Sequence, residues 1–314
     1  MRAPQSLLLC AITVLMLSAQ APSAPAGTTH NGVTALALCD LPPVGPDYGH
    51  APTFPFTMPP GAAATVDFSE SGERCSVRRV DGTLYVRTVS DALGRLVMTE
   101  YFDGRGSLYQ ETINEYAEED FGTADREPCS SSSWQARSQE WAFLPIQWYF
   151  NVGSILYGLN KDTTVTAARS AHAEWETNDN KCLYPDQSSI DYGYQGPTSL
   201  TVARDYQSIV DFGELTLVGC SSTAIACALG WHNSAGQRNE HDIRLDDDSG
   251  WTNRPDLDLD LFDVWNLMAH EVGHRSLFLD ITDDWQVMFH GHRRDDTYKR
   301  RLSQGDAIGN NTKW

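Results

Sequence analysis

The chain has 314 residues, which is enough for one large domain or two moderate ones with a buried core. Its 23 basic and 42 acidic residues give a formal charge of −19, which argues against binding to nucleic acid or to anionic membranes. With 41% hydrophobic residues, the composition is typical of a soluble globular protein. We expect a monomer with neither nucleic acid nor a membrane as its partner.

Residues 1–26 have the pattern of a secretory signal peptide. Arg2 supplies a short positive region, an apolar run extends from Leu7 to Leu17, and Ala24-Pro25-Ala26 offers small residues for cleavage. The apolar run is shorter than the roughly 20 residues that a transmembrane helix needs. The pattern therefore predicts a secreted, extracellular protein.

The cysteine count agrees with export. Removal of Cys10 with the signal peptide leaves six of the seven cysteines, and an even number in an oxidising compartment favours three disulfides. Six cysteines allow fifteen connectivities. Of these we expect a local pair and two pairs that close longer loops: Cys220–Cys227, Cys39–Cys75 and Cys129–Cys182.

A β-rich N-terminal region is predicted over residues 27–133. Prolines make its first part loop-like, up to about residue 60. An antiparallel meander should follow, because three strand-like runs are separated by glycine-containing turns: Thr83–Ser90, Arg95–Phe102 and Ser107–Ile113. The serines Ser130–Ser133 have the composition of a linker. The region is either a propeptide or a permanent accessory domain.

Residues 134–314 have an α/β pattern and are predicted to form a second domain. Strands are expected at Ile146–Val152, Ser189–Gly193, Ala224–Trp231 and His241–Leu245. An amphipathic helix is expected at Thr164–Asn178, and a second helix from Asp260 to about Leu277.

The second helix contains His270-Glu271-Val272-Gly273-His274. Histidines four residues apart lie on one helical face, so both imidazoles can reach one cation. Glu271 can then take a proton from a water that zinc has made acidic, and that water can attack a peptide carbonyl.

At this point the sequence resembles the metzincin metallopeptidases, and the matrixin branch most closely. Asp280 follows His274 by six residues and Met288 follows Asp280 by eight, as in the family's third ligand and methionine turn. The segments His241–Thr252 and Leu302–Asp306 are also similar to matrixin segments. The resemblance covers about residues 140–314 and does not include the N-terminal region.

The resemblance implies a zinc site with His270, His274 and Asp280 as ligands, Glu271 as general base and Met288 beneath the metal. It implies an α+β fold with a mixed, mostly parallel twisted sheet and an active-site helix. An extended polypeptide substrate should bind as an added strand. The edge expected to receive it comprises Ala224, Ile225, Ala226, Ala228 and Leu229.

Several positions depart from the family pattern. Leu277 stands where the family has a glycine in an unusual backbone conformation, so we expect this turn to be built differently. Arg244 replaces a structural-zinc histidine, so no second zinc is expected there. Ser249 replaces a calcium-binding glutamate, which leaves the preceding aspartates as either a Ca²⁺ site or a solvated loop. His290 and His292 are either exposed or substitute for Asp280.

These patterns predict a secreted zinc endopeptidase. The alternative is a catalytically inactive, secreted binding or surface protein on the same scaffold. The matrixin latency cysteine is missing, and Cys75, the nearest match, is expected in a disulfide instead. An intact Glu271 favours the enzyme, because binding alone does not need a general base.

Overall fold

The protein is described here from a computed structural model, in which residues 63–67, 74–79, 84–91, 93–103, 108–117, 127–254 and 260–314 are described. The predicted signal peptide and the proline-rich segment lie outside these residues. No helix in the described part of the chain is sufficiently long and apolar to cross a bilayer.

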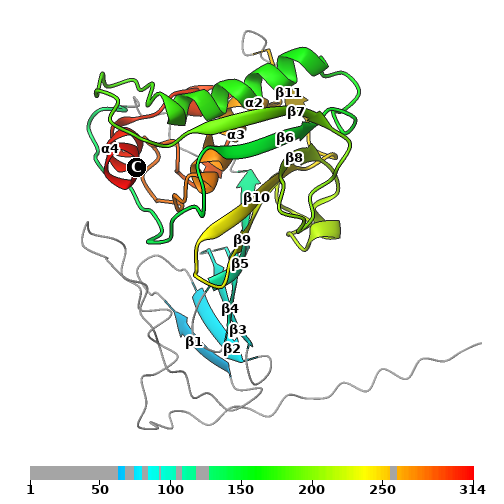
Figure 1. The fold of residues 1–314 in the computed structure, drawn as a ribbon, viewed down its shortest axis with the longest axis vertical. Helices are drawn as coiled ribbons and strands as arrows, with labels where there is room; N and C mark the ends of the chain where they lie inside the picture. The colour runs from blue at the N-terminus through cyan, green and yellow to red at the C-terminus, as the bar shows by residue number, and fades with distance from the viewer. Residues whose placement is uncertain are drawn as a thin grey trace, which may run out of the picture. The chain divides into compact units, whose positions relative to one another are not determined.

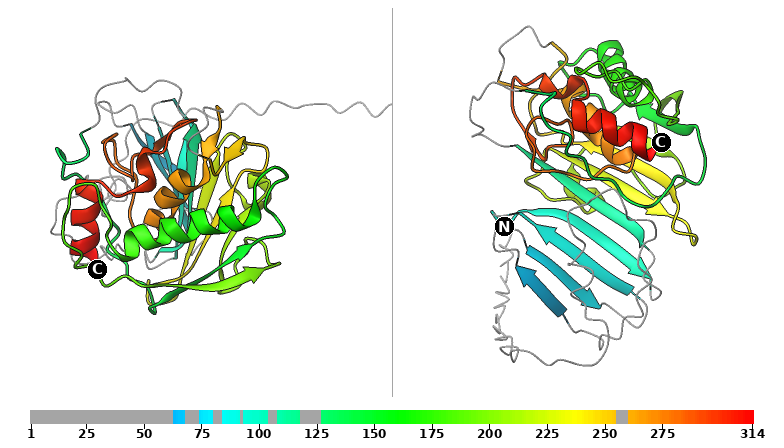
Figure 2. Two further views of the ribbon diagram at one scale, coloured as in Figure 1. Left: turned by 90° about the horizontal axis from the view of Figure 1, so that it is seen from above. Right: turned by 90° about the vertical axis from the view of Figure 1, so that its left-hand side faces the viewer.

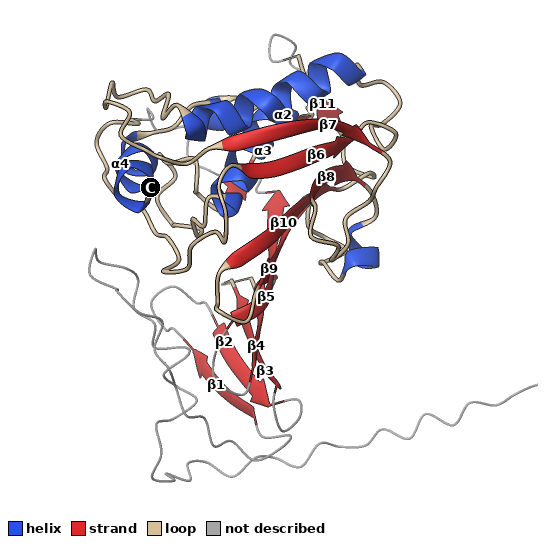
Figure 3. Cartoon of the chain, viewed as in Figure 1, coloured by secondary structure: helices blue, strands red, loops and turns tan. Residues whose placement is uncertain are grey.

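One 11-stranded mixed sheet forms the centre of the structure (Figures 1 and 3). Its main path runs in the order β1-β2-β3-β4-β5-β9-β10-β8-β6-β7, and β13 pairs with β5. The first half is antiparallel and contains the predicted meander. Its strands are β1 (Ala63–Asp67), β2 (Arg74–Arg79), β3 (Leu84–Ser90), β4 (Leu96–Asp103) and β5 (Leu108–Ala117).

The second half of the sheet is mostly parallel, as expected. The pairs β6–β7, β6–β8 and β8–β10 are parallel, whereas β9 is antiparallel to both β10 and β5. The sheet as a whole is therefore mixed. The strands of this half are β6 (Ile146–Asn151), β7 (Tyr192–Thr198), β8 (Ser208–Phe212), β9 (Ala226–His232), β10 (Arg238–Leu245) and β13 (Gly291–His292). A separate pair joins β11 (Trp251–Thr252) to β12 (Phe262–Asp263).

Helices α2 (Lys161–Glu176) and α3 (Val264–Arg275) pack against each other over the second half of the sheet (Figures 1 and 2). The main apolar core lies between them and the strands. The Trp175 indole of α2 also donates a hydrogen bond to the Ala269 carbonyl of α3 at 2.7 Å. Helix α4 (Gln304–Lys313) follows β13 in the sequence. Two short 3₁₀ turns lie at Leu215–Val218 and Tyr298–Arg300.

Both predicted helices exist but with different ends. The predicted helix from Asp260 begins at Val264 instead, because the Asp263 side chain accepts a hydrogen bond from the Asn266 amide at 2.7 Å and caps it. Asn160 caps α2 in the same way, so this helix begins at Lys161, three residues before the predicted start. The strand predicted at Ser189–Gly193 is shifted to Tyr192–Thr198. Strands β1, β2 and β8 and the two-residue strands β11, β12 and β13 were not predicted.

Two of the three predicted disulfides are confirmed. Cys129 is bonded to Cys182 and Cys220 to Cys227. Cys75 is also disulfide-bonded, and its predicted partner Cys39 lies outside the described residues. Disulfides of this kind form in oxidising compartments.

We therefore expect mature protein from an oxidising host to contain no free thiol. The measurement is thiol titration under denaturing conditions without reductant, with a fully reduced sample as control. One reactive thiol per chain would contradict the expected three disulfides.

Candidate metal centre

Helix α3 carries three of the predicted site residues into the protein interior. The side chains of His270, Glu271 and His274 are all 0% exposed. The histidine spacing brings the two Nε2 atoms within 3.0 Å of each other. The predicted sharing of one helical face is thus observed in the structure.

Two backbone carbonyls fix the orientation of these imidazoles. Nδ1 of His270 donates to the Val287 carbonyl at 2.8 Å, and Nδ1 of His274 donates to the Phe278 carbonyl at 2.9 Å. A carbonyl only accepts, so each Nδ1 must carry a proton. In the neutral rings, both Nε2 lone pairs therefore face the same point, which is the arrangement of histidine ligands around a metal.

Asp280 reaches the same point through a sharp turn after α3. Its Oδ1 lies 3.2 Å from His270 Nε2 and 3.4 Å from His274 Nε2. At the turn, Leu277 has a φ of 73°, which is the left-handed conformation that normally favours glycine. The expectation of a different turn was wrong: a fully buried leucine adopts the strained conformation, because its side chain packs in the main core.

Replacing Leu277 by Gly should therefore destabilise the protein by about 2 kcal/mol. Relief of the left-handed backbone is worth about 1–2 kcal/mol, whereas loss of a buried leucine side chain costs about 2–5 kcal/mol. Urea unfolding of the variant and of wild type measures the difference. A stabilised Leu277→Gly variant would show that backbone strain outweighs packing at this turn.

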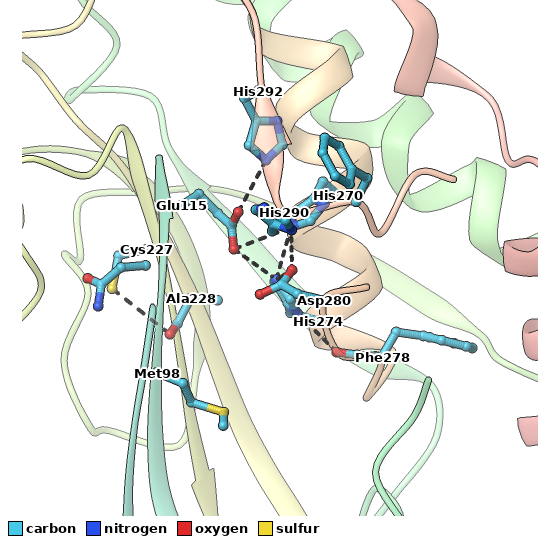
Figure 4. Close-up of polar contacts among 12 residues, drawn as sticks. Met98, Glu115, Cys227, Ala228, His270, His274, Phe278, Asp280, His290 and His292 are labelled. Atoms are coloured by element: carbon cyan, nitrogen blue, oxygen red, sulfur yellow. Dashed lines mark hydrogen bonds and ion pairs between the residues drawn. The ribbon is translucent and has the colours of Figure 1, made fainter. Parts of the chain in front are cut away.

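A fourth group, Glu115 of β5, completes the cluster and was not predicted (Figure 4). Its Oε1 lies 3.3 Å from His270 Nε2 and 3.2 Å from His274 Nε2. One potential ligand atom from each of Glu115, His270, His274 and Asp280 lies within 4.8 Å of the other three. This buried group could hold a metal ion.

The charges within this cluster favour a cation. Burial opposes the charged imidazolium of His274, but the carboxylates of Asp280 and Glu115 outweigh burial and raise the pKa of His274 well above its usual value. For Asp280, burial and the Glu115 charge act against ionisation, yet the two histidines lower its pKa to about 2. One buried and one partly buried carboxylate, of Glu115 and Asp280, thus face two imidazoles, and a metal cation would neutralise these carboxylates.

Glu271 differs from the other acidic groups of the cluster. Both of its carboxylate oxygens are buried without a hydrogen-bond partner. Burial, followed by the nearby charge of Glu115, raises the pKa of Glu271 to about 8. A carboxyl group whose pKa lies near neutral pH is suited to accept and return a proton.

Met288 is buried against Gly273 of α3. It is 1% exposed, and a Cβ atom added at Gly273 would collide with Met288 Sδ and with the Trp175 ring. Gly273 thus allows this close approach.

The two histidines beyond Met288 do not join the four-residue cluster. His290 is partly buried, with Nδ1 3.3 Å from the Ile281 carbonyl. His292 is 2% exposed, so exposure was wrongly expected for it, and its Nε2 lies 3.3 Å from Glu115 Oε2. It is buried because its strand, β13, pairs with the end of β5.

The predicted substrate edge is not free. Of the edge residues, Ala226, Ala228 and Leu229 lie in β9, with Ala224 and Ile225 just before it. Strand β9 pairs with β10 on one side and with β5 on the other. An N-terminal strand therefore occupies the position that was predicted for a substrate.

The positions that depart from the matrixin pattern have structural roles. Arg244 forms a buried ion pair with Asp211 at 2.6 Å. The Ser249 hydroxyl donates to an Asp246 carboxylate oxygen at 2.7 Å. Asp246, Asp247 and Asp248 do not appear among the potential metal-binding groups of the described residues.

Comparisons with known proteins do not assign the chain to a family. No protein-family model matches it, and a search of curated proteins found no matching sequence.

Proposed function

We propose that the protein is a secreted zinc-dependent endopeptidase with a matrixin-like catalytic region. The observation that carries the proposal is the convergence of His270 Nε2, His274 Nε2 and the Asp280 carboxylate next to the unpartnered carboxylate of Glu271. Three ligands and a general base are the protein groups that a hydrolytic zinc site requires.

The donor set fits zinc better than a harder cation. Ca²⁺ and Mg²⁺ prefer oxygen ligands throughout, whereas zinc readily takes histidine nitrogen together with carboxylate oxygen. Ligand atoms about 2.0–2.1 Å from a tetrahedral zinc lie about 3.3 Å from one another. Five separations between ligand atoms of the cluster, from 3.0 to 3.4 Å, agree with that geometry.

Bound zinc would polarise the substrate carbonyl and make a water molecule nucleophilic near neutral pH. The proton transfers would be carried out by the chain's own residues. Glu271 would accept a proton from the attacking water and deliver it to the leaving amine nitrogen. His270 and His274 would stay fixed through their Nδ1 hydrogen bonds to the carbonyls of Val287 and Phe278.

The order of elements supports the matrixin resemblance. The histidine-bearing helix α3 is followed by a sharp turn to Asp280, by the buried Met288 and by helix α4, which begins within the matrixin-like segment Leu302–Asp306. An extended polypeptide substrate would add antiparallel to β9 only when β5 no longer occupies that edge. The disulfides support secretion.

A second candidate is an inactive binding protein with a structural metal. Glu115 favours it, because a fourth protein ligand would close the coordination sphere, as in structural zinc sites. The unpartnered Glu271 favours the enzyme, because a structural site has no use for a buried base.

Zinc analysis and a casein assay test the proposal. Full-chain protein would be assayed on fluorescein-casein before and after mild trypsin treatment, with trypsin then inhibited. We expect one zinc per chain and cleavage that 1,10-phenanthroline abolishes and added Zn²⁺ restores. Bound zinc without phenanthroline-sensitive cleavage in either preparation would favour the binding protein instead.

A further inference from the structure

The first residues of β5 pair with β4, whereas the end of the strand runs into a slot formed by β9 and β13 of residues 134–314. On one side it runs antiparallel to β9, with Glu115 opposite Ala226. On the other side, Tyr116 and Ala117 pair in parallel with β13, at Gly291 and His292. At its end, β5 therefore makes main-chain contacts with β9 up to Glu115 and with β13 at Tyr116 and Ala117, as an extended peptide in this slot would make in turn.

The side chain of Glu115 extends from this strand directly into the candidate metal centre (Figure 4). Oε1 faces both Nε2 atoms of the α3 histidines, at 3.2 and 3.3 Å. Oε2 lies 3.3 Å from His292 Nε2, and the other nitrogen of that ring lies 3.5 Å from the Lys299 ammonium. These buried partners on both sides hold the carboxylate in one orientation.

Glu115 is positioned as the fourth protein ligand of the set. Catalytic zinc sites keep one position for water, whereas sites with four protein ligands are closed. A carboxylate in the fourth position would exclude the water that Glu271 must deprotonate. With a metal bound, β5 would thus occupy the strand-binding slot and its Glu115 would occupy the position that a hydrolytic site keeps for water.

We propose that the region containing β1–β5 is an autoinhibitory segment, in which β5 occupies the substrate slot and Glu115 occupies the water position on the metal. This inference rests on the proposed zinc peptidase function. Glu115 would keep the metal site inactive. Activation would then require β5 to leave the slot.

The disulfide pattern is compatible with removal of this segment. The four cysteines that follow β5 pair among themselves, as Cys129–Cys182 and Cys220–Cys227. Cys75 and the other cysteines of the chain all precede β5. A single cut between β5 and Cys129 would therefore leave no covalent connection between β1–β5 and the metal-binding half.

Buried ion pairs also hold β5 in register. Glu111, on the same face of the strand as Glu115, forms ion pairs with Arg137 and Arg238, and both of these arginines lie in residues 134–314. The strand should therefore stay in the slot while the chain is intact.

Binding of acetohydroxamate to the cobalt-substituted full chain tests the proposal without requiring activity. This ligand needs an open metal position, and its binding is followed in the visible absorption of Co²⁺. We expect Glu115→Ala and Glu115→Gln to bind it at least tenfold more tightly than wild type. Thr112→Val, a substitution on the opposite face of β5, should bind it as weakly as wild type.

The outcomes separate the alternatives. Equal hydroxamate affinity in wild type and in the Glu115 variants would overturn the proposal. So would loss of cobalt from a Glu115→Gln variant with native circular dichroism, because Glu115 would then be a permanent structural ligand. If the variants open the metal position but trypsin-treated protein cleaves no casein, the peptidase function fails while the blocking role of Glu115 stands.

Discussion

Replacing Glu271 by Gln should leave one zinc per chain but lower casein hydrolysis by trypsin-treated protein at least about a hundredfold. Glutamine has nearly the same shape but cannot take up the proton, and general-base catalysis supplies roughly 10²–10⁴ in rate. The side chain is fully buried and makes no hydrogen bond, so its loss should disturb little else. Metal analysis and kcat/KM are the two measurements.

Glu174→Gln is the matched control. Glu174 is a buried carboxyl group on α2, and burial raises its pKa to about 8, as for Glu271. It is not part of the metal-binding cluster. We expect wild-type zinc content and activity from this variant. A wild-type rate in Glu271→Gln, or an equal loss in both variants, would remove Glu271 from the proposed role.

The part of the site that depends on local spacing could be predicted from the sequence. His270 and His274 share one helical face because they are four residues apart. The carbonyls that accept hydrogen bonds from the two rings belong to Phe278 and Val287, which follow α3 closely in the sequence. Asp280 and Met288 could be placed only through the matrixin resemblance. The structure places both around α3, although the strained Leu277 lies between the helix and Asp280.

Glu115 could not be predicted, because its place depends on pairing between distant segments. It is 155 residues from His270 in sequence, and the β5–β9 ladder brings the two together. In the segment Leu108–Ala117, Glu111 and Glu115 resemble the solvent-facing residues of an ordinary meander. Both are buried, since cationic or histidine partners from the other half of the chain surround them.

The fold, like the site, could be predicted where the signal is local and could not where it depends on pairing between distant segments. The meander strands and both long helices were predicted, because alternation, turns and helical periodicity are local signals. Strand β8 was missed because all five residues of Ser208–Phe212 are buried, so the segment has no alternation. The antiparallel pairing of β5 with β9, which unites the two halves of the sheet, has no local signal at all.

Replacing Asp280 by Ala should empty the metal site. Substituting residues that merely orient a ligand costs about 10–100-fold in affinity, so loss of a ligand should cost at least about a hundredfold. Because Glu115 lies in the same cluster and could replace the missing carboxylate, the measurement belongs in a Glu115→Gln background. Zinc affinity by competition with a chromophoric chelator, together with casein cleavage after trypsin treatment, should fall in parallel.

Three further variants show whether Asp280 itself is the ligand. Asp280→His should retain zinc, because imidazole is a normal zinc ligand and histidine holds this position in most metzincins. His290→Ala should retain both zinc and activity, since His290 contacts the Ile281 carbonyl and lies outside the cluster. If His290→Ala or His292→Ala empties the site while Asp280→Ala does not, the third ligand lies beyond Met288. The approach of Asp280 Oδ1 to within 3.4 Å of both histidines argues for the first result.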